Sequence, residues 1–150
     1  MTLEIYKPTL ADLRDEAPLT RAEQALLDGC KTGDVVVLGE VPPQEATDGN
    51  AIRAGLIRYL MLGGCEEARP HPKGVQVAGA FVVEQLDFLA CKSPLPIIIK
   101  NSQFLETPLF RDSETGVFDL RGSIVPGLQA VRMRVFGSLL LAQGFVAKGI

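Results

Sequence analysis

Few residues of this chain belong to the types that usually carry out chemistry. His71 is the only histidine, and it stands between two prolines in a turn-like segment, where we expect a turn residue rather than a ligand. The three cysteines, Cys30, Cys65 and Cys91, are far apart along the chain, so no Cys-x-x-Cys motif for metal or redox chemistry is present. We expect Cys91 to be an inert core thiol and the other two, near helix ends, to be more exposed.

Aspartates and glycines do not form a catalytic or nucleotide-binding pattern either. Asp87, Asp112 and Asp119 fall between apolar positions of a repeat in the second half, where we expect solvated faces or contacts between coils. Gly63-Gly64 follows a predicted helix instead of opening one, and neither a G-x-G-x-x-G nor a G-x-x-x-x-G-K fingerprint occurs. The sequence therefore predicts no catalytic residue, no cofactor and no metal site.

One group of charged residues is a candidate surface site. Four arginines recur at neighbouring units of the repeat, and they form either a basic strip on one side of the molecule or an ordinary solvated face. These residues are Arg111, Arg121, Arg132 and Arg134.

The composition indicates one folded unit that we expect to be cytoplasmic. The 150 residues are 47% hydrophobic and 22% charged, which is enough to bury a core without disulfides or metals. The N-terminus carries acids and a proline where a signal peptide needs bases and an apolar run. The most apolar stretch, Val135 to Ile150, is interrupted by Gln143 and Lys148, so we expect no membrane insertion.

The chain changes character near residue 73. Residues 1–73 contain 12 acids and 8 bases, for a net charge of −4, whereas residues 74–150 contain 6 acids and 7 bases, for a net charge of +1. The first part predicts a small helical cap with one short strand. Its elements are a helix over Thr20–Gly29 opened by a Thr-x-x-Glu capping box, a strand over Val35–Leu38, and a helix over Asn50–Leu62 that Asp48 or Asn50 would cap.

Residues 74–150 contain an internal repeat with a nearly constant period. Apolar anchor residues recur at spacings of 11, 11, 11, 10, 10 and 11, and the residue two positions before each anchor is also apolar. The residue three positions after each anchor is small in six of seven cases. The residue five positions after each anchor, from Val82 in the first unit to Val146 in the last, is the fourth position of the repeating frame. The anchors are Val77, Phe88, Ile99, Phe110, Leu120, Ala130 and Leu141.

Two such units make a closed coil of about 21 residues with four sides. Such coils hydrogen-bond to one another at the strand spacing of about 4.8 Å and stack like side chains in the interior. The predicted fold is therefore mainly β: a quadrilateral parallel β-helix of about 3.5 coils over residues 74–150, joined to the helical cap of residues 1–73 as one structural unit. Its narrow interior is filled by side chains, so we expect no ligand cavity.

The frame resembles that of the pentapeptide-repeat proteins, whose units place a large apolar residue at the centre and a small one two positions earlier. This resemblance implies that the β-helix is right-handed. The repeat departs from the family pattern, because alternate faces carry Val, Leu or Ile where the family prefers Ala, and most units have an extra residue. The matching centres are Val77, Val82, Phe88, Ile99, Phe104, Leu120, Val125, Leu141 and Val146, with small partners at Ala80, Ser102, Ser123 and Gly144.

A longer part of the chain resembles a set of bacterial pentapeptide-like proteins. The resemblance covers LTRAEQALLDG, AIRAGLIRYLMLGG, the HPKGV turn, GVQVAGAFVVEQLDF, PLPIIIKNSQF and VFDLRGSIVPGL. Some members carry the label "membrane-associated oxidoreductase", which implies a redox activity. No dinucleotide fingerprint or paired-cysteine motif accompanies that label here.

These patterns favour a non-enzymatic scaffold or interaction module with an unidentified protein partner. The apolar sequence after residue 138 has no capping pattern, so we expect either a longer chain beyond Ile150 or a homodimer through the C-terminal coil end. The expected contact residues are Leu139, Leu141, Phe145 and Val146.

Two alternatives come from the resemblances. The first is inhibition of a topoisomerase by DNA mimicry, which would require dense negative charge, whereas the coil half has a net charge of +1. The second is an oxidoreductase, which follows from the family label alone. No nucleic-acid partner is expected.

Overall fold

Helices gather in the first half of the chain and short strands follow through the second. A computed structural model describes residues 10–64, 70–142 and 144–147. The helices are α1 (Leu10–Glu16), α2 (Arg21–Thr32) and α3 (Ala54–Met61). The strands are β1 (Val36–Val37), β2 (Ala51–Arg53), β3 (Val75–Ala78), β4 (Phe81–Val83), β5 (Ile97–Lys100), β6 (Gln103–Phe104), β7 (Glu114–Thr115), β8 (Phe118–Asp119), β9 (Ile124–Val125), β10 (Arg134–Val135), β11 (Leu139–Leu140) and β12 (Val146–Ala147).

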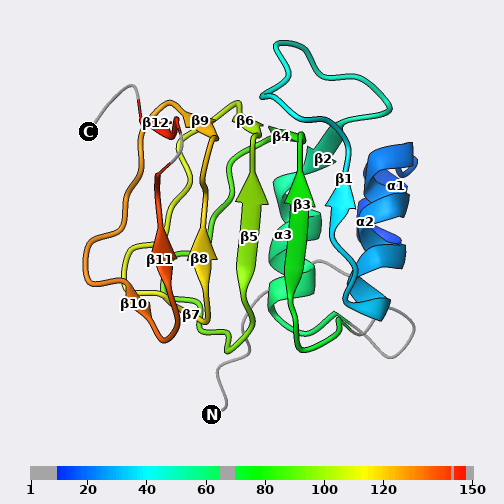
Figure 1. Cartoon of the computed structure of the whole chain (residues 1–150). Coiled ribbons are helices and arrows are strands. Elements are labelled where there is room, and N and C mark those ends of the chain that lie inside the picture. The colour runs from blue at the N-terminus through cyan, green and yellow to red at the C-terminus, as the bar shows by residue number, and fades with distance from the viewer. Residues whose placement is uncertain (1–9, 65–69, 143, 148–150) are drawn as a thin grey trace.

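The strands stack as parallel sheets along one axis. Sheet A has the order β1-β3-β5-β8-β11, sheet B the order β2-β4-β6-β9-β12, and β7 pairs with β10 in a third sheet. In Figure 1 the strands of sheet A lie side by side, with β11 at one end and the helices at the other. Val75 pairs with Ile97, and Ile97 pairs with Phe118, so successive coils contain nearly equal lengths of chain.

Each coil has four sides. Sheets A and B form two of them, and β7 with β10 forms the fourth. The third side is marked by isolated parallel bridges from Asp87 to Leu109 and from Leu109 to Gln129. The strands after residue 74 make about three turns of a β-solenoid, so the predicted mainly β architecture of stacked four-sided coils with N-terminal helices is confirmed.

The interior of the solenoid is filled by the repeat. The first five anchors are at most 1% exposed, whereas the last two, Ala130 and Leu141, are only half-buried. The Phe110 ring contacts the rings of Phe88 and Phe118, with centroid separations of 5.8 and 4.9 Å. Burial therefore follows the repeat and weakens only in the last coil, which no described residue covers.

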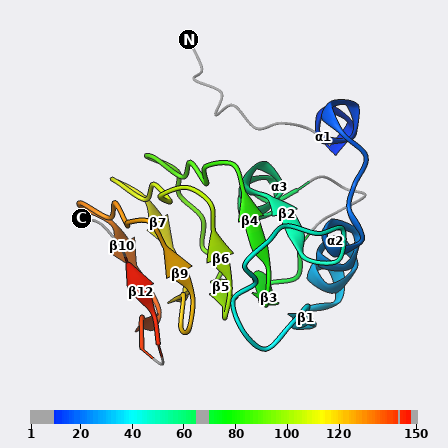
Figure 2. The ribbon, with the colours of Figure 1, turned by 90° about the horizontal axis from the view of Figure 1, so that it is seen from above.

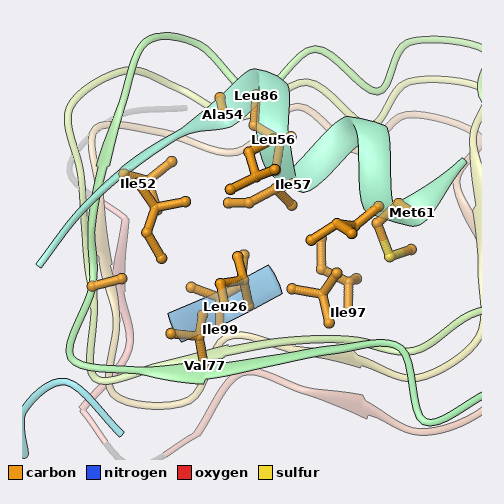
Figure 3. Close-up of a cluster of buried hydrophobic side chains, with 14 of the residues drawn as sticks. Leu26, Ile52, Ala54, Leu56, Ile57, Met61, Val77, Leu86, Ile97 and Ile99 are labelled. Carbon is orange, nitrogen blue, oxygen red and sulfur yellow. The ribbon is translucent and has the colours of Figure 1, made fainter. Parts of the chain in front are cut away.

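The cap continues the sheets of the solenoid instead of merely covering its end. β1 pairs in parallel with β3, and β2 pairs in parallel with β4. Leu26 of α2 and Ile57 of α3 lie in one cluster with Val77 and Ile99 of sheet A, as Figure 3 shows. The core thus runs without interruption across residue 73, where the sequence changes composition.

A buried ion pair joins the helices to the first strand of sheet B. The Glu23 carboxylate accepts N–H groups from the Arg53 backbone (3.0 Å), from Arg53 Nε (2.9 Å) and from Thr20 (2.9 Å), the last completing the predicted capping box. Arg53 Nη1 donates to the carbonyl of Leu13 in α1. Glu23 is 0% exposed, and its hydrogen bonds raise the pKa of Arg53 further above its usual value.

Two expected helices have different bounds in the structure. The helix expected over Asn50–Leu62 begins only at Ala54, because residues 51–53 are drawn into sheet B opposite β4. Asn50 does not cap it, since its Oδ1 accepts the Thr47 N–H instead. α2 extends beyond the expected Thr20–Gly29 to Thr32, where Gly33 ends it at a φ of 81°. α1 was not predicted from the sequence.

Two opposite corners of each coil use left-handed backbone. One corner has Gly79, Asn101 and Gly122 at positive φ, in successive coils. The other has Ala90, Asp112 and Arg132, with φ of 56°, 56° and 57°. Residues other than glycine adopt this region at a cost of about 1–2 kcal/mol each, so the corners restrict which sequences fit the coil.

Buried serines complete the first of these corners. Ser123 Oγ accepts the Ser102 N–H (3.1 Å) and donates to the Ile99 carbonyl (2.8 Å). One coil earlier, Ser102 Oγ accepts the Ala80 N–H (3.0 Å). The hydroxyl of each coil therefore replaces a backbone acceptor that the sharp bend has moved away, which is the physical reason for small polar residues in the inward column.

Replacing Ser123 by alanine should destabilise the fold by about 1–3 kcal/mol, because the buried Ser102 N–H loses its acceptor. The matched control is Ser113→Ala at the other corner. Ser113 Oγ only donates to the Phe110 carbonyl, which also accepts the Ser113 N–H, so this variant should lose less. Urea unfolding of both variants measures the difference, and equal losses would contradict the role assigned to Ser123.

Replacing Ala90 by glycine should stabilise the fold by about 1 kcal/mol, because glycine adopts positive φ without the steric cost. The thermal midpoint should rise by about 3 °C for a chain of this size. Ala46→Gly is the control, since Ala46 is exposed and is not among the residues with positive φ. A lower midpoint for Ala90→Gly would show that the corner is not strained.

Candidate functional site

The last coil exposes apolar side chains that earlier coils bury. Leu139 pairs with Phe118 in sheet A, yet Leu139 is 57% exposed and Phe118 only 1%. The difference arises because β11 is the outermost strand of sheet A and no described residue stacks on it. The same end therefore presents both apolar side chains and the unpaired backbone groups of an edge strand.

The four residues expected at the coil end do not all face the same way. Leu141 and Phe145 are half-buried and pack against the core cluster. Val146 was expected in the inward column of Val125, but it pairs with the outward residue Ile124, and Ala147 takes the place opposite Val125. One extra residue in the last corner shifts the frame, so Val146 lies on the outer side of sheet B.

Sequence reasoning missed two exposed apolar residues near this end. Phe136 is 70% exposed and Val131 is 51% exposed. Val131 lies in the corner that contains Arg132, Phe136 follows β10, and both lie between the anchor positions Ala130 and Leu141. A search for large apolar residues outside the inward columns would have found them.

The four candidate arginines lie on different sides of the coil. Arg132 and Arg134 line an open depression of about 510 Å³ on the side formed by β7 and β10, together with Lys92 and Glu114. Arg121 follows β8 in sheet A and pairs with Asp119 at 2.8 Å. The arginine side chains therefore do not form one continuous strip.

Acidic residues neutralise much of the positive charge on the side formed by β7 and β10. Arg132 Nη2 donates to Asp112 Oδ2 at 3.0 Å across neighbouring coils, and this hydrogen bond lowers the pKa of Asp112. Lys92 Nζ lies 3.2 Å from Glu114 Oε2. Arg111 is exposed, and its positive charge also lowers the pKa of Asp112.

The three aspartates expected on solvated faces differ in environment. Asp112 makes the expected contact between coils. Asp119 is only 2% exposed, because its carboxylate is covered by the Arg121 guanidinium. Asp87 accepts the Leu89 N–H at its own corner, which is a local turn bond and not a catalytic arrangement.

His71 and the described cysteines have structural positions. His71 Nδ1 accepts the Lys73 N–H, and the His71 N–H donates to the Cys30 carbonyl, so this residue ties the turn before β3 to α2. Cys91 is buried as expected, whereas the expectation of an exposed Cys30 is wrong: it is 2% exposed, with its thiol 3.4 Å from the Gly74 carbonyl. Cys65 lies outside the described residues.

Residues 10–64, 70–142 and 144–147 contain neither a cluster of metal ligands nor a membrane-spanning helix. Within these ranges, no three His, Cys, Asp or Glu residues gather as metal ligands would. In the same residues, the helices are too short or too polar to cross a bilayer.

The fold and its exposed end define the class of the protein as a β-solenoid with a helical cap. Comparison of the chain with protein-family models, with curated proteins and with solved structures finds no match.

The thiols of a Cys65→Ser variant should be unreactive in the folded state. Burial raises the pKa of the Cys30 thiol to about 11, so only about 0.1% is thiolate at pH 8. A chromogenic aromatic disulfide should therefore react slowly in native buffer, at a rate that rises with pH, and should titrate both remaining thiols quickly in denaturant. Rapid reaction of two equivalents in native buffer would contradict the buried position of Cys30.

Proposed function

We propose that this chain is a non-enzymatic scaffold of the pentapeptide-repeat type, which binds other proteins through its surfaces and forms a homodimer through its C-terminal coil end. The observation that carries the proposal is the exposure of Leu139 on an edge strand, in a column that is buried in every earlier coil. Large apolar side chains beside unpaired strand edges are typical of surfaces that a partner covers.

Tail-to-tail contact suits two copies of this chain. A two-fold axis perpendicular to the solenoid axis reverses the direction of the second coil, so an axis through sheet A would bring β11 against its counterpart as an antiparallel strand. Leu139 and Leu141 would then continue the inward columns across the contact. Phe136, at 70% exposed, would lie at the edge of the same contact.

Charge distribution favours this role over DNA mimicry. The coil half has six acids and seven bases, and its Asp112 and Glu114 carboxylates are paired with cations from the same side. A duplex mimic needs one negative charge about every 1.7 Å.

The proposal places the protein in the cytoplasm, which suits the free thiols of Cys30 and Cys91.

The Leu139→Glu variant should be monomeric where the wild type is dimeric, because two carboxylates would meet in the apolar contact. Light scattering coupled to size exclusion at tens of micromolar measures both masses. Val37→Glu is the matched control, since Val37 is 66% exposed on β1 at the opposite edge of sheet A. A monomeric wild type, or a control that also dissociates, would overturn the dimer.

A further inference from the structure

The outer side of sheet B is mostly apolar beyond β2. Its inward residues Val82, Phe104 and Val125 are at most 1% exposed, so the residues that alternate with them face outward. Two outward columns result, in register from coil to coil. Beyond β2, whose Ala51 and Arg53 begin the two columns, the first is Phe81, Gln103, Ile124 and Val146, and the second is Val83, Leu105 and Pro126.

These columns border a groove that the loop between β1 and β2 closes on one side. The groove has a volume of about 370 Å³ and is lined by Gln44 of the loop and by Phe81, Gln103, Phe104, Leu105 and Pro126. Figure 2 looks onto sheet B and shows this loop beside β4. Leu105 is 56% exposed within it, so the groove has an apolar floor open to solvent.

The loop is held in place by a close backbone contact. The Leu38 N–H donates to the Ala78 carbonyl at 2.7 Å, and a Cβ on Gly79 would overlap the backbone of Gly39. Gly79 also has a φ of 77°. This fixed start makes the loop a wall of the groove.

Acidic residues lie near the groove residues along the chain. Glu84 and Glu106 follow β4 and β6 at the corner where sheet B ends, and Glu40 and Glu45 are exposed on the loop. Partial burial raises the pKa of Glu84, and repulsion from neighbouring carboxylates, first Glu16 and then others that include Glu106, raises it further. The negative charges at this corner are therefore close enough to repel one another.

Two cations of the neighbouring elements, Arg53 and Arg121, are already paired. Arg53 acts to lower the pKa of Glu84, but its guanidinium is bonded to Glu23 and the Leu13 carbonyl. Arg121 belongs to the neighbouring sheet A and is paired with Asp119. The groove therefore combines an apolar floor with an excess of nearby acids, because Glu40, Glu45, Glu84 and Glu106 outnumber Lys100, which ends β5 three residues before Gln103.

We propose that this groove, between the outer face of sheet B and the loop from β1 to β2, binds a cationic amphipathic segment of a partner protein. The inference rests on the proposed role as an interaction module, but it uses a surface other than the coil end that includes Leu139. Apolar side chains of the segment pack on Leu105 and Pro126, and its lysine or arginine side chains pair with Glu45 and Glu106. Charge complementarity selects this occupant over an acidic one.

A synthetic peptide that alternates lysine with leucine, and has one tryptophan at its centre, is the probe. The chain contains no tryptophan, so the indole emission reports the peptide alone. We expect a saturable blue shift and higher anisotropy on titration with the full chain, and binding that weakens at about 1 M ionic strength, where screening acts within about 3 Å. A glutamate–leucine peptide of the same length should not bind.

Two variants test the groove and one controls for general charge. Leu105→Lys and Glu106→Lys should each weaken binding about tenfold or more. Leu89→Lys is the matched control, because Leu89 is 48% exposed at the third side, and it should bind as the wild type does. The Leu139→Glu variant should also bind the peptide, which separates this surface from the dimer contact.

Several results would overturn the groove. One is that Leu89→Lys weakens peptide binding as much as Leu105→Lys does, and another is that the glutamate–leucine peptide binds as tightly as the lysine–leucine peptide. A third is that binding does not saturate. A fourth is that peptide binding is lost as the protein self-associates, which would mean that a second copy occupies the groove. If the wild type is monomeric and the peptide binds as expected, the groove stands and the dimer fails. If the wild type is a dimer and the peptide does not bind, the groove alone fails.

Discussion

The Glu23 carboxylate joins the helices of the cap to the first strand of sheet B. It is fully buried, and Thr20 and Arg53 supply the N–H groups that solvate it. Removing one partner of such a pair costs about 3–5 kcal/mol, because the other charge is left buried without compensation. Since Arg53 ends β2, and every later strand of sheet B stacks in register on β2, the position of the whole sheet depends on this contact.

Beyond the cap, the coils are held mainly by their immediate neighbours. Backbone bonds such as Ile97 N–H to the Val117 carbonyl link each coil to the next, and serine hydroxyls bridge the corners where the backbone turns too sharply. Solenoid stability is therefore approximately a sum over adjacent coils. A binding surface on one side, such as the groove beside Leu105, can vary without disturbing the interior, because outward residues make few of these contacts.

The repeat made the solenoid predictable, because inward positions recur whenever a coil closes and only apolar or small residues fit there. Local patterns were less decisive. Residues 51–53 have the pattern of a helix start, but they pair with β4, which lies far along the chain and outside any local pattern. The expected contact residues were found from apolar character alone, and Val146 was misplaced by one residue added at a corner. The groove depends on a loop whose position follows from the Gly39–Gly79 contact, which sequence spacing does not reveal.

The near-constant coil length has a mechanical consequence. The register of sheet A, from Val75 to Ile97 to Phe118, means that each coil holds almost the same length of chain between one layer and the next. If the molecule were pulled by its C-terminal end, layers would peel away in turn toward the cap, and each would release about 70 Å of extended chain. The stack would then lengthen in nearly equal steps, and the ion pair at Glu23 would be among the last contacts to bear the load.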